Sequence, residues 1–268
     1  MSNHPFLTDF DLDLIRLLAA DFVLLSGKQI QALFPQRSSS NIRYRLHRLK
    51  SLGFISCRLF PAHYDVPKLP LYFVGPKAAE PLSLERSDPT FIAHRKRAIY
   101  LRERAIPHFL LIQSVYSKFL VETRHSNSCQ LTSWIQPYDP LWNTFREYGL
   151  GFRPDGYGEL HIQTLIQPFF LEVDRGDEHT PLLKTKFDRY NDYARSGNFQ
   201  HHFGISAFRL LFITTSPKRV HKLLRLTASH TPHLFWFATF QDFLDKPLLD
   251  PYWSASGSDV IHSLSTPL

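Results

Sequence analysis

Residues 152–178 read FRPDGYGELHIQTLIQPFFLEVDRGDE, and this segment combines a strand pattern with several acidic residues. Its apolar and aromatic residues predict a strand around Asp155 and a longer strand over residues 161–173. The longer strand ends at Glu172 and Asp174. Because successive side chains of a strand point to opposite faces, Glu172 and Asp174 should share a face. The sequence therefore predicts a sheet on which these two carboxylates and that of Asp155 converge.

Regular elements flank this segment on both sides. Thr180 and Pro181 mark the start of one helix, and Gly197 follows its end. The predicted order is helix, three strands, helix, strand, helix, strand, which requires a mixed sheet covered by helices. The expected elements are a helix over 107–122, strands over 130–136, 151–160 and 161–173, a helix over 180–196, a strand over 208–215, a helix over 216–227 and a strand over 233–240.

The first third of the chain has a different pattern, with three amphipathic helices before two strands. Thr8 is the expected N-cap of the first helix, Pro35 ends the second, and Gly53 closes the third. The spacing R-x-x-L-x-x-L-x-x-x-G-x-I over residues 43–55 resembles that of bacterial winged-helix regulators. We therefore predict a winged helix-turn-helix. Its expected elements are helices over 8–25, 28–34 and 38–54, and strands over 55–60 and 71–74 that are separated by a break at Pro61–Pro67.

The two patterns together predict an α+β chain, in which a winged helix-turn-helix precedes an α/β domain with a mixed central sheet. The expected domains are a winged helix over 1–83, a basic linker helix within 84–106, and the α/β domain over 107–268. The linker contains the sequence IAHRKRAIYLRERA. It either extends a DNA-binding surface or forms a solvated connector.

Positive charge is concentrated in the predicted winged helix. The chain has a net charge of +7, and no acidic residue occurs from Phe22 to Tyr64. Such one-sided charge suits DNA phosphates, and early residues of a recognition helix approach base edges in the major groove. The alternatives are a solvated basic face and a winged helix that docks to protein. We assign base contacts to Ser39, Ser40, Arg43 and Tyr44, place His47 on the same helix face, and assign phosphate contacts to Lys28, Arg48 and Arg58.

Asp155, Glu172 and Asp174 form the predicted metal-binding and catalytic set. Carboxylates are hard oxygen ligands that suit Mg²⁺ or Mn²⁺, and such an ion can activate water and stabilise charge on a scissile phosphate. The order of elements resembles the αβββαβ core of the PD-(D/E)XK nuclease superfamily. In that superfamily a lysine usually stands two positions after the second acid, where this chain has Asp174.

In some members of the superfamily this lysine lies on the neighbouring helix, and the resemblance implies that a lysine of the next helix could act in the same way here. Lys186 is the first candidate and Lys184 the second. Tyr190 follows Lys186 by four residues, so the two side chains share one helix face and complete the predicted catalytic set.

A narrower resemblance rests on the strings FRPDGYGEL and FFLEVDRGDE, followed by Lys186 and Tyr190 and preceded by a winged helix. This combination resembles the bacterial replication-relaxation family of plasmids and other mobile elements. The resemblance implies a role in plasmid replication or its control, and it leaves three functions open. In the first, the protein nicks or cuts DNA. In the second, it is a sequence-specific regulator of replication or transcription, and its nuclease-like domain is an inactive scaffold for dimerisation or partner docking. In the third, it is mainly a protein-interaction module.

In the scaffold alternative, Glu172 or Asp174 would pair with Arg175 or Lys186. The expected partners are double-stranded DNA, a second copy of the chain in a homodimer, and partner proteins of the mobile element. No apolar run is long enough for a transmembrane helix, and the start of the chain lacks a signal-peptide pattern. We therefore expect a cytoplasmic protein without a membrane partner.

Overall fold

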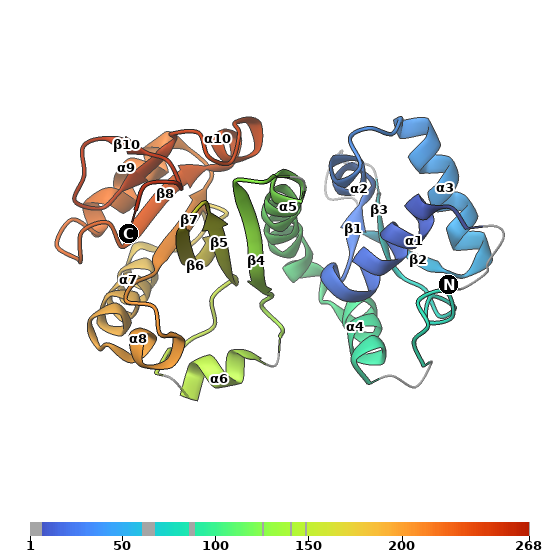
Figure 1. Ribbon diagram of the computed structural model, residues 1–268, viewed down its shortest axis with the longest axis horizontal. Helices are drawn as coiled ribbons and strands as arrows, with labels where there is room; N and C mark the ends of the chain where they lie inside the picture. Colours follow the sequence, from blue (N-terminus) through green and yellow to red (C-terminus); the bar gives the residue numbers. More distant parts are fainter. Residues whose placement is uncertain are drawn as a thin grey trace. The chain divides into compact units, whose positions relative to one another are not determined.

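The chain divides into two compact units in a computed structural model that describes residues 7–60, 68–85, 89–124, 126–139, 141–147 and 149–267 (Figure 1). The first unit is Met1–Ser117 and the second is Lys118–Leu268. The domain boundaries predicted after residues 83 and 106 stay predictions. The break expected at Pro61–Pro67 lies outside the described residues.

The first unit contains the predicted winged helix-turn-helix, in which three helices are followed along the chain by two paired strands. The strands form an antiparallel sheet in the order β1-β3-β2. The strand β1 was not predicted from the sequence. It is only two residues long and pairs with β3 on the side opposite β2. The elements are α1 (Asp9–Arg16), a π-helical turn (Leu17–Asp21), β1 (Leu25–Ser26), α2 (Gly27–Leu33), α3 (Ser39–Leu52), β2 (Ile55–Phe60) and β3 (Leu69–Val74), followed by α4 (Pro89–Tyr100), a 3₁₀ turn (Glu103–Ala105) and α5 (Ile106–Thr123).

The second unit is built on the predicted mixed sheet, which confirms the fold class. Its strand order is β10-β9-β8-β7-β6-β5-β4. The pairs β6-β7 and β7-β8 are parallel, and the other pairs are antiparallel. The strands are β4 (Cys129–Ile135), β5 (Gly156–Ile162), β6 (Leu165–Val173), β7 (Arg209–Thr214), β8 (Phe235–Thr239), β9 (Trp253–Ala255) and β10 (Ile261–His262).

The strand expected over 161–173 is two strands in the structure. Residues 161 and 162 end β5, and Ile162 faces Leu165 of β6 across a two-residue hairpin turn. Gln163, in the turn, has a positive φ of 55°. No glycine marks this turn, so the sequence lacks the usual hairpin signal.

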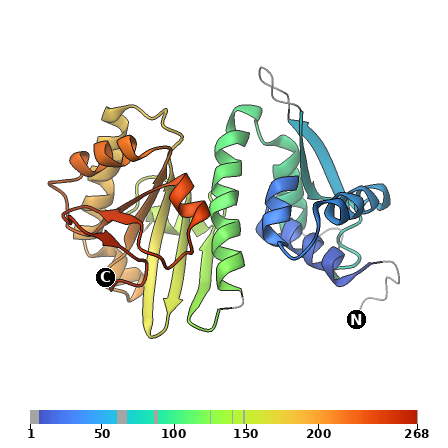
Figure 2. The same cartoon turned by 90° about the horizontal axis from the view of Figure 1, so that it is seen from above.

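Helices cover both faces of this sheet (Figure 2). On one face, the α7, α8 and α9 side chains share a core with Phe170, Phe212 and other strand residues. On the other face, Phe119 of α5 contacts Phe169 of β6 and Phe243 of α10. No helix of the described residues is long and apolar enough to cross a membrane. The remaining helices are α6 (Leu141–Glu147), α7 (Thr180–Arg195), α8 (Asn198–Phe203), α9 (Pro217–Leu226) and α10 (Phe240–Asp245).

Candidate functional site

Helix α3 presents the side chains predicted to read DNA bases. The helix begins after Ser38, whose hydroxyl accepts a hydrogen bond from the backbone N–H of Asn41, and it ends at Gly53 with a left-handed φ of 83°. Apolar side chains at residues 42, 46 and 49 are buried in the unit's core. The opposite face is therefore free to meet a ligand. Its exposed residues are Ser39, Ser40, Arg43, Tyr44 and His47.

Arg45 is a basic residue of α3 that does not belong to this exposed face. Its guanidinium is buried and forms an ion pair with Asp11 of α1, in which Nε donates to Oδ1 at 2.8 Å. Asp11 also closes the capping box with Thr8 at the start of α1. Arg45 therefore anchors α3 to the core of the unit.

A hollow of about 470 Å³ lies between α2, α3 and β3. The polar side chains of Lys28, Ser39 and Arg43 line it, and Ile42 and Tyr72 contribute apolar and aromatic surface. The structure thus gathers one predicted phosphate contact, Lys28, and two predicted base contacts around the same depression.

Arg58, another predicted phosphate contact, lies at the C-terminal end of α4. Its NH1 atom donates to the carbonyl oxygens of Ala98, Ile99 and Leu101 at 3.0, 3.1 and 3.1 Å. These bonds satisfy carbonyl groups that a helix end leaves without partners. Arg58 therefore has a structural role, and its phosphate contact stays a prediction. Arg48 is half-buried on α3.

The second unit brings Glu172, Lys186 and Tyr190 into direct contact. Glu172 is buried near the end of β6, and its side chain points to α7. The Tyr190 hydroxyl donates to Oε1 of Glu172 at 2.7 Å, and Lys186 Nζ donates to Oε2 at 2.9 Å. Lys186 and Tyr190 reach the same carboxylate because they are one helical turn apart on α7. Lys184, the second lysine candidate, is exposed.

Asp155 lies beside this group, immediately before β5. Its backbone N–H donates to the carbonyl oxygen of Leu171 at 3.0 Å, and its Oδ2 accepts from the backbone N–H of Val173 at 2.9 Å. The Asp155 side chain is close enough to Glu172 that its negative charge raises the pKa of Glu172. The carboxylates of Asp155, just before β5, and of Glu172, in β6, therefore share one electrostatic environment.

Burial dominates the electrostatics of Glu172. It raises the pKa of this carboxyl group to about 7, with Asp155 adding to the rise and Lys186 opposing it. Burial alone would lower the pKa of Lys186, but the negative charges of Glu172 and Glu178 raise it above the usual lysine value. Burial, together with Glu172, also raises the pKa of Tyr190. Tyr190 therefore keeps its proton and donates a hydrogen bond to Glu172.

Glu178 is a member of this cluster that was not predicted from the sequence. Its Oε1 accepts a hydrogen bond from Lys186 Nζ at 2.9 Å, so the ammonium group lies between Glu178 and Glu172. The other oxygen of Glu178, Oε2, is buried and has no hydrogen-bond partner within the described part of the chain. The acidic string after β6 was the available signal, but nothing in it distinguished Glu178 from Asp177.

Asp174 has a different set of partners from the one predicted. Its Oδ2 accepts from Thr214 and from Nε of Arg219, both at 2.8 Å, and its Oδ1 accepts from the N–H of Gly176 at 2.9 Å. NH2 of Arg219 also donates to the carbonyl oxygen of Glu178 at 2.8 Å. Asp174 thus fixes the turn that carries Glu178. Its predicted metal and catalytic roles are untested.

Asp155 and Glu172 offer oxygen atoms of the kind that divalent metals bind. Across the described ranges, no three His, Cys, Asp or Glu side chains are grouped as metal ligands. Mg²⁺ is commonly held by one or two carboxylates together with substrate phosphates and water. Asp155 and Glu172 supply such a pair of oxygen ligands, so these two residues fit a divalent ion. The predicted metal site of Asp155, Glu172 and Asp174 stays a prediction.

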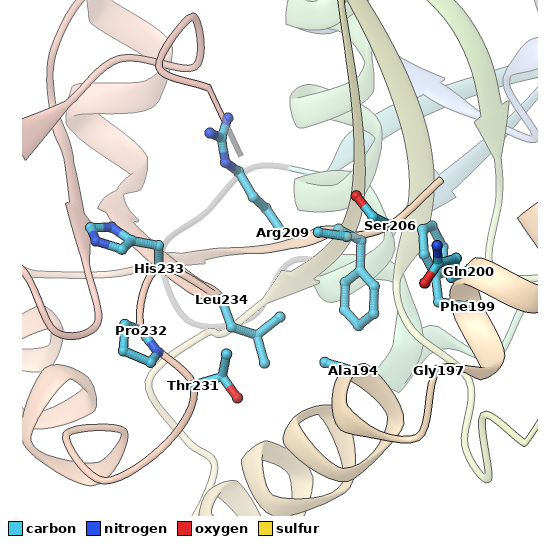
Figure 3. A pocket seen from close by; sticks show the side chains of 12 residues that line it. Ala194, Gly197, Phe199, Gln200, Ser206, Arg209, Thr231, Pro232, His233 and Leu234 are labelled. Atoms are coloured by element: carbon cyan, nitrogen blue, oxygen red, sulfur yellow. The ribbon is translucent and has the colours of Figure 1, made fainter. Parts of the chain in front are cut away.

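Another hollow, of about 240 Å³, opens at the amino-terminal ends of β7 and β8 (Figure 3). Phe199, Pro232 and Leu234 line it, while the side chain of Arg209 points away from these residues. None of the predicted site residues lines this hollow. Because Glu172 lies near the opposite ends of the parallel strands, the hollow is separate from the carboxylate cluster.

The chain is similar to known proteins in sequence and in structure. The family model described as Replication-relaxation matches residues 16–207. A protein from Halomicrobium mukohataei with a GntR-superfamily winged-helix-turn-helix domain shares 20% identity over 38% of this chain and 67% of that chain, with a TM-score of 0.26. Restriction endonuclease FokI bound to DNA shares 13% identity over 90% of this chain and 45% of that chain, with a TM-score of 0.26. No curated protein matches the sequence.

Proposed function

Because the chain belongs to the replication-relaxation family, we propose that its first unit binds duplex DNA through α3 and that it acts on the DNA of a plasmid or other mobile element. The observation that carries this proposal is the exposed face of α3. Arg43 and Tyr44 project from it, and Tyr44 is 61% exposed although it is a large aromatic residue. The face opposite the apolar stripe of a recognition helix is the one that enters a major groove.

The electrostatics of the first unit support the same proposal. Asp11, an acidic residue that contacts α3, is neutralised by Arg45 on the buried side of the helix. The exposed side and the adjoining hollow present Lys28 and Arg43. Phosphates would therefore meet cations without a nearby opposing carboxylate from residues 22–60.

The test of DNA binding uses the full chain and a pool of random duplexes, from which a preferred sequence is selected. Arg43→Ala should weaken binding to that sequence by roughly 1 to 3 kcal/mol and relax the preference, because a base contact is lost. Lys28→Ala should weaken all duplexes alike. Lys218→Ala, which removes an exposed lysine from α9, is the charge-matched control. Equal affinity of Arg43→Ala and the unchanged chain would contradict the assignment.

A second candidate function, cleavage of DNA with a divalent metal, is favoured by the position of the Asp155 carboxylate beside Glu172. The ion pair of Lys186 with Glu172 is equally the pair that an inactive scaffold would contain. Asp155 and Glu172 would hold Mg²⁺ or Mn²⁺, and such an ion would supply an activated water and stabilise negative charge on a phosphate. Tyr190 fixes one oxygen of Glu172, which orients the carboxylate. Lys186 carries a positive charge at the same place, where it can stabilise a phosphate that approaches the cluster.

Cleavage is tested by incubating supercoiled plasmid with the protein and Mn²⁺. Nicked or linear product should appear with the unchanged chain and disappear with Asp155→Asn and with Glu172→Gln. Asp188→Asn, which removes a carboxylate that contacts His230 on the far side of α7, is the matched control and should retain activity. Product that survives both site substitutions would reveal a contaminant. Absence of product from a chain that binds DNA would favour the regulator with an inactive nuclease-like domain.

A further inference from the structure

Helix α4 has a basic surface that the proposed function does not use. Its opposite side is fixed within the first unit, where His94 Nε2 lies 3.1 Å from the carbonyl oxygen of Phe22. Arg58 of β2 holds the C-terminal end of the helix through the three carbonyl oxygens described above. Because both the side and the end of α4 are anchored, its outward residues keep a defined arrangement.

These outward residues surround an open depression of about 510 Å³, which we call the α4 hollow. Tyr100 projects at the hollow with 76% of its surface exposed. Lys96 and Arg102 are exposed and form no ion pair with any residue that the structure describes. The hollow is lined by Ala93, Lys96, Arg97, Tyr100, Leu101, Arg102 and Ala105, without a carboxylate.

The combination of cations with an exposed aromatic ring limits the ligand class. Cations alone would suit any polyanion, including duplex DNA or an anionic membrane surface. An aromatic face beside them is the arrangement that binds single-stranded nucleic acid, because an unpaired base can stack on the ring while its phosphates meet the cations. Bases inside a duplex are already stacked and cannot reach Tyr100.

We propose that the α4 hollow is a second nucleic-acid site, which binds a single strand by stacking a base on Tyr100 and placing phosphates against Lys96 and Arg102. This site is distinct from the exposed face of α3. The proposal goes beyond duplex binding, and it predicts that one unit of the protein holds duplex and single-stranded DNA on different surfaces.

The experiment measures binding of a fluorescent oligothymidine of about 15 nucleotides to the full chain over a salt series. Lys96→Ala/Arg102→Ala should weaken binding. It should also make the negative slope of the logarithm of the binding constant against the logarithm of the salt concentration less steep by about 1.4, at about 0.7 for each lost contact. Tyr100→Leu should weaken binding at least about fivefold, whereas Tyr100→Phe should keep it within about twofold because the ring remains. Lys218→Ala/Arg225→Ala on α9 is the charge-matched control and should change nothing.

Duplex binding, measured in parallel, separates this proposal from the previous one. Arg43→Ala should weaken duplex binding and leave oligothymidine binding unchanged, and Tyr100→Leu should do the reverse. Oligothymidine binding that is absent, or equal in Tyr100→Leu and the unchanged chain, would overturn the α4 hollow as a single-strand site. Loss of duplex binding in the Lys96→Ala/Arg102→Ala variant, with oligothymidine binding intact, would also overturn it. Thermal melting of each variant confirms that these surface substitutions leave the fold unchanged.

Discussion

Glu172 holds a proton more tightly in the folded chain than in the unfolded chain, because burial raises its pKa to about 7. As the pH rises from about 5 to about 8, the unfolded chain has already released this proton while the folded chain must give it up. The contribution of Glu172 to the free energy of unfolding therefore falls. We predict that, over this interval, the free energy of unfolding of Glu172→Gln rises by roughly 1 to 3 kcal/mol relative to that of the unchanged chain. Urea unfolding in the presence of a chelator measures this difference.

Tyr190→Phe is the companion variant, since it keeps the carboxylate and removes the hydrogen bond to Oε1. That bond stabilises the charged form of Glu172, so its loss should raise the pKa of Glu172 further and enlarge the pH-dependent loss of stability. A stability difference between Glu172→Gln and the unchanged chain that is constant from about pH 5 to about pH 8 would contradict the argument.

At the scale of single residues, local spacing predicted some of the contacts in the candidate site and missed others. The four-residue spacing of Lys186 and Tyr190 placed both on one helix face, and the structure has both in contact with Glu172. Asp174 was grouped with Glu172 by strand alternation alone. Its partner Arg219 is 45 residues away on α9, and no local pattern announces so distant a contact.

At the scale of elements, long periodic segments were predictable and most short ones were not. The seven-residue helix α2 was predicted because Pro35 marks its end. The apolar spacing of α3 gave its buried face. Arg45 belongs to that face because it stands three residues after Ile42 and four before Leu49. Helices α6, α8 and α10 were missed, because six or seven residues give too few repeats of a helical period. The strands β9 and β10 are shorter still and are held by pairing with β8 and with each other.

The long helix α5 shows why its surroundings could not be read from its amphipathic pattern. The pattern predicted one helix lying across a sheet. In the structure the division of the chain into two units falls within this helix, between Ser117 and Lys118. A continuous apolar stripe indicates burial, but it does not say which neighbours bury each turn.

At the scale of the whole molecule, the two ends of α5 should contribute to the stability of different units. In the first unit, Gln29 Nε2 donates to the carbonyl oxygen of Leu110 at 2.7 Å, and the Tyr116 hydroxyl donates to Asp21 at 2.8 Å. In the second unit, the buried ring of Phe119 stacks on Phe169 with centroids 5.1 Å apart. Each end of the helix is thus held by contacts within its own unit.

We predict that Phe119→Ala lowers the free energy of unfolding of the second unit by about 3 to 5 kcal/mol, because a large buried ring leaves a cavity. Duplex affinity should stay within about twofold of the unchanged chain, because the contacts of α2 with the first part of α5 remain. Ile112→Ala, a buried change in the first unit, is the counterpart and should destabilise the DNA-binding unit instead. Urea unfolding and duplex binding of both variants measure this. If Phe119→Ala reduces duplex affinity as strongly as Arg43→Ala does, then the units do not act independently, and DNA recognition depends on the integrity of the carboxylate-bearing sheet.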